Sequence, residues 1–344
     1  MLTVYSEDHR QHFPKHELFK GEFVTPFEKP ERVDAVLNRV KAVALGEVIT
    51  PRDFGMAPLL RVHAPNFVTY LQTAWMQWIA LGRDHDILPF VFPALGFRKV
   101  EPQHIDGKVG FFAFDTGAPI SAHTWQAVQS AANCAVTAQK HLSAGARAAF
   151  ALCRPPGHHA GSDFVGGYCY INNAAVAAQA FLDDGAQRVA ILDVDYHHGN
   201  GTQEIFYRRS DVLYTSIHGH PEREYPYFLG YADEIGEAAG LGYNHNYPLH
   251  DGATYEQWGG AMAHACKKIL AYAPDALVVS LGVDTFEADP ISRFKLKSED
   301  YLRMGKTIGQ LRVQTLFVME GGYAVEAVGI NTVNVLQGFE TTAI

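Results

Sequence analysis

Three side chains that can bind a metal follow one apolar segment of the sequence. Residues 191–202 read ILDVDYHHGNGT, so Asp193, Asp195 and His197 alternate directly after the apolar run. In an extended chain, residues two apart point to the same side, so these side chains should project together. Two carboxylates and an imidazole repel one another or lose hydration at a buried position unless a cation lies among them. The pattern favours a metal site over its alternative, a capped loop with an ion-paired aspartate.

A second apolar segment, residues 276–281, leads through Gly282 and Val283 to Asp284. Alone, this aspartate could equally be a helix cap. Together with Asp195 and His197 it would complete a set of three ligands. Three protein ligands with a vacant position are typical of a catalytic metal site, whereas structural sites are closed by four.

Two further motifs supply groups for acid–base and oxyanion chemistry. In RPPGHHAG, residues 154–161, the prolines and Gly157 favour a fixed turn that holds His158 and His159. Because three metal ligands are already found, we favour an acid–base role for these histidines over the alternative that they lie on a surface loop without a role. In LFVMEGGY, residues 316–323, a strand would end at Glu320, and the hydroxyl of Tyr323 could donate to a developing oxyanion. The assembled groups predict metal-assisted hydrolysis of an amide.

The elements that position these motifs are predicted to alternate between strands and helices. The apolar runs that read as strands are continuous, as in strands buried on both faces of a parallel sheet: residues 3–5, 148–153, 189–194, 212–217, 277–281 and 316–319. Helical patterns lie between them, at residues 30–45, 122–142, 172–182, 255–272 and 298–311. The sequence therefore predicts a single α/β domain over residues 1–344. Residues 82–110 show weak periodicity and indicate a functional loop or an interface.

Composition narrows the classes of partner and compartment. The formal net charge is −9 and no basic cluster is present, which argues against nucleic acid as a ligand and is compatible with cationic substrates. The four cysteines form no C-x-x-C pair and read as reduced thiols. The first residues do not resemble a signal peptide, and no apolar run is long enough to cross a membrane. We therefore expect a cytoplasmic protein.

Together the motifs resemble the histone deacetylase superfamily, which has the arginase/deacetylase fold. Beside the segments above, the resemblance rests on GGYCYINNAA at residues 166–175, GVDTF at 282–286 and EGGY at 320–323. It implies one domain with an eight-stranded, mostly parallel sheet flanked by helices. It also implies Zn²⁺ bound by Asp195, His197 and Asp284.

The resemblance also implies roles for the remaining polar residues. His159 would be the general base and acid, His158 an electrostatic partner hydrogen-bonded to Asp193, and Tyr323 the group that polarises the acetyl carbonyl. Tyr168 and Tyr225 would form aromatic walls of a substrate tunnel. A structural K⁺ is implied near the zinc, with ligands drawn from Asp193, Asp195, His197, Ser216 and Ile217.

Within that superfamily, the pattern is most similar to the acetylpolyamine amidohydrolases. Asn200 stands behind the catalytic histidine where many histone deacetylases carry aspartate, and Pro290 follows Asp284 as in that subgroup. The insert at about 82–110 implies a homodimer with a narrowed tunnel. An acidic residue, with Asp106 and Asp115 as candidates, would meet the distal ammonium of a small acetylated diamine such as acetylputrescine or acetylcadaverine.

Three alternatives remain open at this stage. The chain could deacetylate acetyl-lysine in proteins, or be a binuclear manganese ureohydrolase of the same fold, or be a binding module that retains the metal without turnover. The manganese alternative lacks ligands for a second ion, since Asn200 is neutral. The ligand set also suits ferrous iron or cobalt.

Overall fold

The six apolar runs form six neighbouring strands at the centre of one sheet. In the computed structural model, which describes residues 1–342, the sheet order is β4-β1-β5-β10-β9-β6-β7-β8 and every pairing in it is parallel. The strands are β1 (Leu2–Val4), β4 (Val48–Ile49), β5 (Ala148–Ala151), β6 (Val189–Asp193), β7 (Val212–Gly219), β8 (Asn244–Leu249), β9 (Ala276–Leu281) and β10 (Thr315–Met319). The predicted eight-stranded α/β architecture is confirmed.

The two strands of this sheet that the sequence did not predict lie at its two edges. Strand β4 has only two residues, and β8 reads NHNYPL, with polar side chains at several positions. An edge strand is covered on fewer sides, so its residues need not be apolar. A separate antiparallel hairpin, β2 (Glu17–Phe19) and β3 (Glu22–Val24), lies outside the main sheet.

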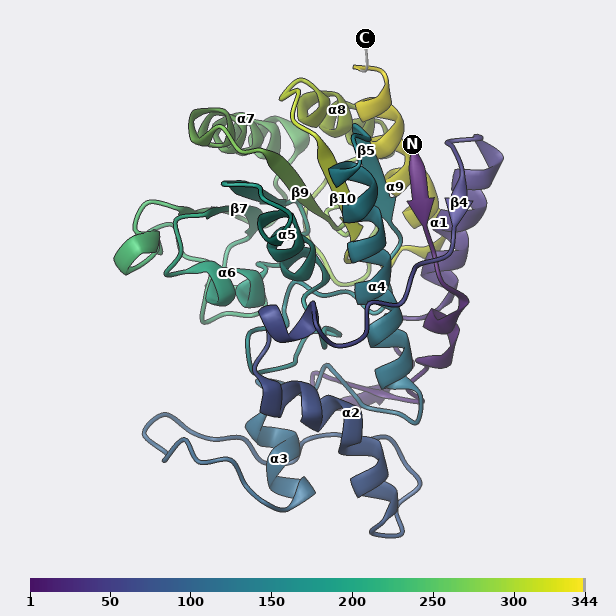
Figure 1. Ribbon diagram of the computed structural model, residues 1–344, viewed down its shortest axis with the longest axis vertical. Helices are drawn as coiled ribbons and strands as arrows, with labels where there is room; N and C mark the ends of the chain where they lie inside the picture. Colours follow the sequence, from purple (N-terminus) through teal and green to yellow (C-terminus); the bar gives the residue numbers. More distant parts are fainter. Residues whose placement is uncertain (343–344) are drawn as a thin grey trace.

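Helices cover both faces of the sheet, as Figure 1 shows. All five predicted helices occur, and α2, α3, α6 and α9 were not predicted. The helices are α1 (Glu31–Ala42), α2 (Pro65–Ile79), α3 (Ile105–Phe111), α4 (Thr124–Ser143), α5 (Asn173–Asp183), α6 (Asn200–Phe206), α7 (Tyr255–Tyr272), α8 (Ser298–Gly309) and α9 (Val325–Glu340); 3-10 turns span Glu7–Gln11, Leu59–Arg61 and Ala238–Gly240.

Alternate residues of each central strand pack into different cores. Leu192, Val279 and Phe317 face a core shared with α1, α7, α8 and α9. Ile191 and Val278 face a second core shared with α4 and α5. Burial on both faces explains why these strands are continuously apolar.

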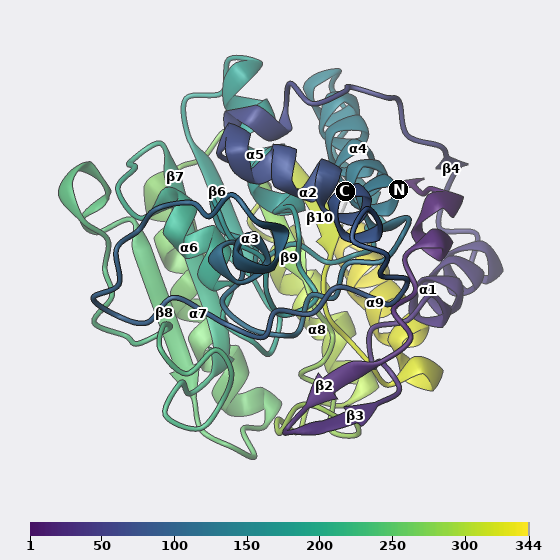
Figure 2. The ribbon, with the colours of Figure 1, turned by 90° about the horizontal axis from the view of Figure 1, so that it is seen from below.

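A third apolar core lies beyond the carboxyl ends of the strands. It packs α2 and α3 against residues of the loops there, including Tyr170 and Ile171. In Figure 1 these helices lie below the strand ends, and Figure 2 shows α3 and its adjoining loops crossing the end of the sheet, with the β2–β3 hairpin to one side. Loops and helices therefore enclose the sheet edge at which the predicted metal ligands emerge.

The predicted insert is irregular for most of its length. Residues 82–104 form no helix or strand apart from a single bridge between Ile87 and Ile120, while residues 105–110 belong to α3. An ion pair between Lys99 and Asp163, 3.1 Å apart, links the insert to the body of the protein. Among the described residues no helix is both long and apolar enough to cross a membrane, and the four cysteines are buried and unpaired.

Candidate metal centre and active site

The three predicted metal ligands come together at the carboxyl ends of two neighbouring strands. Asp195 and His197 follow β6 and Asp284 follows β9, and these strands are paired with Asp193 opposite Ser280. One ligand atom from each of the three residues lies within 4.8 Å of the other two, and all three residues are buried. Ligand sites of parallel α/β sheets occur at this edge.

Backbone amides hold the two carboxylates in place. The amide of Tyr196 donates to Oδ1 of Asp284 at 2.7 Å, and the amide of Gly321 donates to Oδ2 of Asp195 at 2.8 Å. Residue 321 must be glycine for this approach, because a Cβ there would lie 2.5 Å from the Asp195 oxygen. Nδ1 of His197 then lies 3.0 Å from Oδ2 of Asp284 and 3.4 Å from Oδ1 of Asp195.

The crowding of two buried carboxylates fits a cation. Burial, reinforced by the charge of Asp195, raises the pKa of Asp284 to about 7. A carboxyl group with so high a pKa is destabilised as an anion unless a positive charge compensates it. Two carboxylates with one imidazole form a donor set suited to Zn²⁺ with an open position.

The two adjacent histidines face different partners. Nδ1 of His158 lies 3.1 Å from Oδ2 of Asp193, and Nδ1 of His159 lies 2.7 Å from Oδ1 of Asn200. The segment that carries them is fixed by Glu320, whose Oε2 accepts the amides of Gly157 at 2.7 Å and His158 at 3.1 Å.

The environments of His158 and His159 shift the pKa values of the two imidazoles in opposite directions. Burial lowers the pKa of His159 well below its ordinary value, and the positive charges of His158 and His197 lower it further. Burial alone would lower the pKa of His158 too, but the charges of Asp195 and Asp193 raise it to about 10. Without a bound metal, His159 is therefore a neutral imidazole beside a charged one near neutral pH.

Tyr323 follows β10 and lines the cavity above the ligands. Its amide donates to Oδ2 of Asp289 at 2.7 Å, and its ring centroid lies 5.6 Å from that of Tyr168. Burial raises the pKa of Tyr323 well above its ordinary value, so its hydroxyl keeps the proton that it would donate.

Arg32 is an important residue that the sequence reasoning missed. It is fully buried, and it donates from Nε to the carbonyl of Gly322 and from Nη2 to that of Glu320, both at 2.6 Å. Its guanidinium carbon lies 4.6 Å from the ring centroid of Tyr323, and Nη1 bonds to Glu28 at 2.8 Å. The sequence contained an indication that Arg32 is buried, because it precedes Val36 and Val40 at intervals of four residues and so lies on the buried face of α1.

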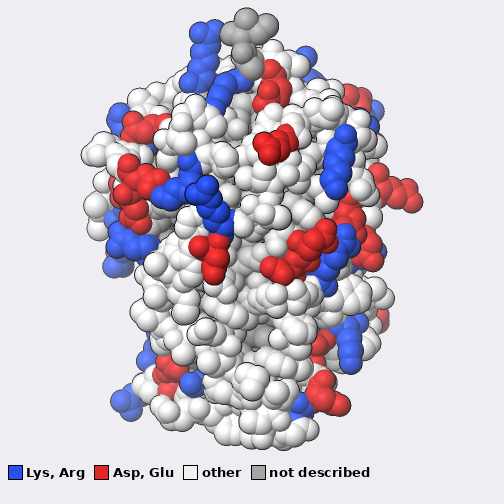
Figure 3. All heavy atoms as spheres, turned by 45° about the vertical axis from the view of Figure 1, so that its right-hand side comes forward, with Lys and Arg blue, Asp and Glu red and all other residues white. Residues whose placement is uncertain are grey.

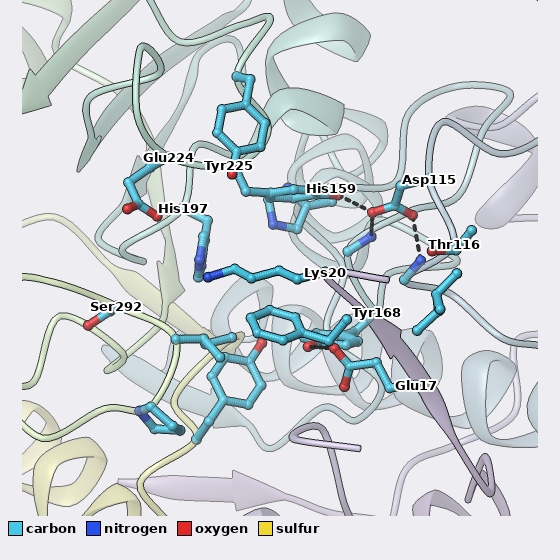
Figure 4. A pocket seen from close by; sticks show the side chains of 18 of the residues that line it. Glu17, Lys20, Asp115, Thr116, His159, Tyr168, His197, Glu224, Tyr225 and Ser292 are labelled. Carbon is cyan, nitrogen blue, oxygen red and sulfur yellow. Dashed lines mark hydrogen bonds between the residues drawn. The ribbon is translucent and has the colours of Figure 1, made fainter. Parts of the chain in front are cut away.

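A cavity of about 410 Å³ opens above the site. His159, His197 and Tyr323 line it together with both predicted aromatic walls, Tyr168 and Tyr225. Figure 4 shows several of these side chains converging from separate loops.

Of the two acidic residues predicted to meet the distal ammonium of the substrate, only one lines the cavity. Asp115 lines the cavity, where its Oδ2 accepts the hydroxyl of Tyr225 at 2.7 Å. Asp106 lies on α3, pairs with Arg83 and does not line the cavity. Sequence reasoning missed Glu17 of the β2–β3 hairpin, which lines the cavity and accepts the hydroxyl of Tyr168 at 2.6 Å.

The residues implied for K⁺ lie on the adjoining strands β6 and β7. Asp193 pairs in register with Ser216, and Ile217 follows it in the same buried strand. The hydroxyl of Ser216 is 2.8 Å from Nδ1 of His218, and Oδ2 of Asp193 accepts the hydroxyl of Tyr214 at 3.1 Å. Carboxylate and hydroxyl oxygens of this kind suit a hard cation.

Comparison with known proteins supports the same assignment. Residues 26–339 match the histone deacetylase domain family. The chain is 64% identical over 340 residues to acetylpolyamine amidohydrolase 2 of Pseudomonas aeruginosa, covering 99% of each chain, and 48% identical over 338 residues to acetylpolyamine amidohydrolase of Mycoplana ramosa, covering 98% of this chain and 99% of the relative. Its structure is similar to that of acetylpolyamine aminohydrolase from Burkholderia pseudomallei, with a TM-score of 0.95, 39% identity and 99% of each chain covered. The chain therefore belongs to the histone deacetylase family, within the group that contains the acetylpolyamine amidohydrolases.

Proposed function

We propose that this protein is a zinc-dependent hydrolase that removes the acetyl group from N-acetylated polyamines or diamines, releasing acetate and the free amine. The observation that carries the proposal is the position of His159, which lines the same cavity as His197 of the buried ligand cluster and whose Nδ1 lies 2.7 Å from Oδ1 of Asn200. The relatives with 64% and 48% identity bear the name acetylpolyamine amidohydrolase, which supports this substrate class.

Asp195, His197 and Asp284 would hold the zinc ion. When bound, the ion polarises the amide carbonyl and lowers the pKa of the attacking water. The remaining steps depend on side chains of this chain. The Nδ1–H of His159 is oriented by Asn200, which leaves Nε2 free to take a proton from water and then to give it to the departing amine nitrogen.

Two neighbours assist His159. The hydroxyl of Tyr323 donates a hydrogen bond to the carbonyl oxygen as negative charge develops on it. The positive charge of His158 stabilises that same developing negative charge and is itself held by Asp193. Arg32 fixes the carbonyls on either side of Gly321 and so positions Tyr323.

The cavity supports a small cationic amine as the substrate. Its volume of about 410 Å³ lies within the usual range for small-molecule sites. The carboxyl groups of Glu17 and Asp115 lie on its wall, and burial raises the pKa of both. A bound ammonium would stabilise their ionised forms.

A substrate panel tests the proposal. Purified protein loaded with zinc should release acetate from N-acetylputrescine and N-acetylcadaverine faster than from acetyl-lysine peptides, and His159→Ala should abolish release. Faster turnover of the peptides would instead favour a protein deacetylase. Activity that requires two manganese ions per chain would favour the ureohydrolase alternative. Comparing zinc with ferrous iron and cobalt identifies the preferred metal.

A structural K⁺ near Asp193 and Ser216 is part of the same proposal, with Asp195, His197 and Ile217 as further ligands. Replacing K⁺ with tetramethylammonium should then lower the melting temperature of the protein. The buried, unpaired thiols support a reducing compartment, the cytoplasm.

We also propose a homodimer formed through the insert. Five of its apolar side chains are exposed, namely Phe90, Val91, Leu95, Phe97 and Val100. Figure 3 shows a different face, with the right-hand side of Figure 1 forward, where acidic and basic side chains intermingle over the upper part. Leu95→Glu with Phe97→Glu should produce monomers in light scattering, whereas the pair Phe23→Glu and Leu270→Glu, exposed elsewhere, should not.

A further inference from the structure

The tip of the β2–β3 hairpin brings a lysine to the cavity. Strand β2 ends at Phe19 and β3 begins at Glu22, so Lys20 and Gly21 form a two-residue turn. Both have positive φ, 51° for Lys20 and 89° for Gly21, as this kind of tight turn requires. Lys20 lines the cavity, and its side chain extends across it in the view of Figure 4.

The acidic and basic residues that line the cavity differ in their exposure to solvent. Glu17 and Glu224 are buried, with 4% and 8% of their surface exposed, and Asp115 is half-buried. The basic residues of the lining, Lys20, Arg223 and Arg293, are all exposed. The exposed basic residues mark the side of the cavity that faces solvent, from which a cationic substrate enters, and the carboxyl groups are shielded from solvent.

Lys20 differs from the two arginines at the mouth in having no acidic partner. Arg293 lies 2.9 Å from Glu224, and Arg223 lies 4.0 Å from Asp251. Across residues 1–342, no carboxylate lies within 4.0 Å of the Lys20 ammonium, which sits 4.9 Å from the ring centroid of Phe19. Its charge is thus uncompensated by any ion pair at the point where a substrate enters.

We propose that Lys20 determines specificity by repelling substrates that carry a second ammonium group at the cavity mouth. The inference rests on the proposed deacetylation of acetylated amines. With the acetyl group at the metal, the single ammonium of an acetylated diamine falls among the inner carboxyl groups. A longer polyamine carries a further ammonium out to the mouth, where it meets the charge of Lys20.

The expected size of this discrimination follows from Coulomb's law. Two like charges about 8 Å apart at a partly screened surface should alter relative affinity by about 3- to 30-fold, depending on the local dielectric. Because the lysine is exposed, salt at about 0.5 M should remove most of the effect. Discrimination that arises from shape instead would not respond to salt.

The test compares N-acetylputrescine, with one ammonium, to N8-acetylspermidine, with two. In zinc-loaded protein, Lys20→Gln should raise the ratio of kcat/KM for acetylspermidine over acetylputrescine by about 3- to 30-fold. Lys20→Glu should raise it further, and Lys20→Arg should keep the wild-type ratio. The matched control is Lys41→Gln, which removes one exposed charge from α1 and should leave the ratio unchanged.

The outcomes separate the two proposals. If the ratio moves less than twofold in both Lys20→Gln and Lys20→Glu, or if its change persists in high salt, charge at residue 20 does not set specificity. If all Lys20 variants, including Lys20→Arg, lose activity equally on both amines, the residue shapes the hairpin only. If wild-type protein hydrolyses acetyl-lysine peptides and neither amine, the proposed function itself fails, and the role of Lys20 with it.

Discussion

Nδ1 of His159 lies 2.7 Å from Oδ1 of Asn200, inside the protein and away from bulk water. The amide oxygen can only accept a hydrogen bond, so the Nδ1 atom carries the proton and Nε2 carries the lone pair. A neutral partner orients the imidazole without stabilising its protonated form as a carboxylate would.

Replacing Asn200 with aspartate should therefore raise the pKa of His159. The group must be unprotonated to accept a proton, so the acid limb of the kcat/KM profile should move to higher pH by about 1 unit or more. The change is measured with N-acetylputrescine between pH 5 and 9. Gln310→Glu adds the same charge at the exposed end of α8 and should leave the profile in place. An unmoved acid limb in Asn200→Asp would assign that limb to another group.

Arg32→Met should damage both stability and activity. It removes the two 2.6 Å bonds to the carbonyls of Glu320 and Gly322 and leaves Glu28 with Arg154 as its remaining ion-pair partner. Loss of one member of a buried ionic network costs about 3–5 kcal/mol of unfolding free energy. The displaced Tyr323 should lower kcat by about tenfold or more.

Urea unfolding and steady-state kinetics measure these two effects. The control is Arg61→Met, which breaks an exposed pair with Asp183 and should cost less than about 1 kcal/mol. Equal stability losses in the two variants would contradict the structural role assigned to Arg32.

Asp284→Asn should affect the metal-loaded protein far more than the metal-free protein. The amide oxygen can still accept the Tyr196 amide, while one of two crowded buried charges disappears. Nδ1 of His197, 3.0 Å from Oδ2 of Asp284, loses an ionic partner at the same time, so the two effects oppose each other and the stability of the metal-free variant should differ from that of the wild type by about 1 kcal/mol or less. Added zinc should raise the melting temperature of the wild type far more than that of the variant. A strongly destabilised metal-free variant would mean that the cluster needs no cation.

Stability should fall with acidification because of histidines buried in neutral form. Burial lowers the pKa of His9, His63 and His218 to about 4 and that of His12 to about 3. Below about pH 6.5 the unfolded chain binds protons that the folded protein does not, so unfolding becomes more favourable as the pH falls toward 4. Between pH 7.5 and 5.5 each such histidine should cost about 1 kcal/mol.

The variant His12→Gln measures the contribution of a single histidine to this pH dependence of the unfolding free energy. Unfolding free energies of the metal-free wild type and variant are compared at the two pH values. The variant should lose about 1 kcal/mol less than the wild type on acidification, whatever its stability at pH 7.5. Identical losses would show that His12 does not titrate on unfolding.

The chemistry of the site was easier to predict than its entrance, for a physical reason. Asp195, His197 and Asp284 directly follow strands whose burial on both faces makes them continuously apolar, so sequence pattern alone places them at one sheet edge. Glu17 and Lys20 come from a three-residue strand and a turn, which are too short to show periodicity. Their position depends on the tertiary packing of the hairpin. For the same reason the sequence could not show that Asp106, a predicted tunnel residue, lies outside the cavity.

The missed helices follow the same logic. Helix α9 contains glycine, asparagine, threonine and four valines, all weak helix formers. It is helical because its buried side chains complete the core shared with α1 and α8. Such a helix is specified by its neighbours rather than by its own residues.

The arrangement of the strands divides the molecule into parts that open at different free energies. The metal donors follow β6 and β9, which lie inside the sheet, so opening the backbone hydrogen bonds of these two strands to solvent requires nearly global unfolding. The hairpin and the insert, by contrast, lie outside that sheet and can fluctuate locally. Amide exchange should therefore be slowest at residues 189–193 and 276–281 and fastest at the entrance, and changes of amine preference could accumulate at the entrance without loss of hydrolytic competence.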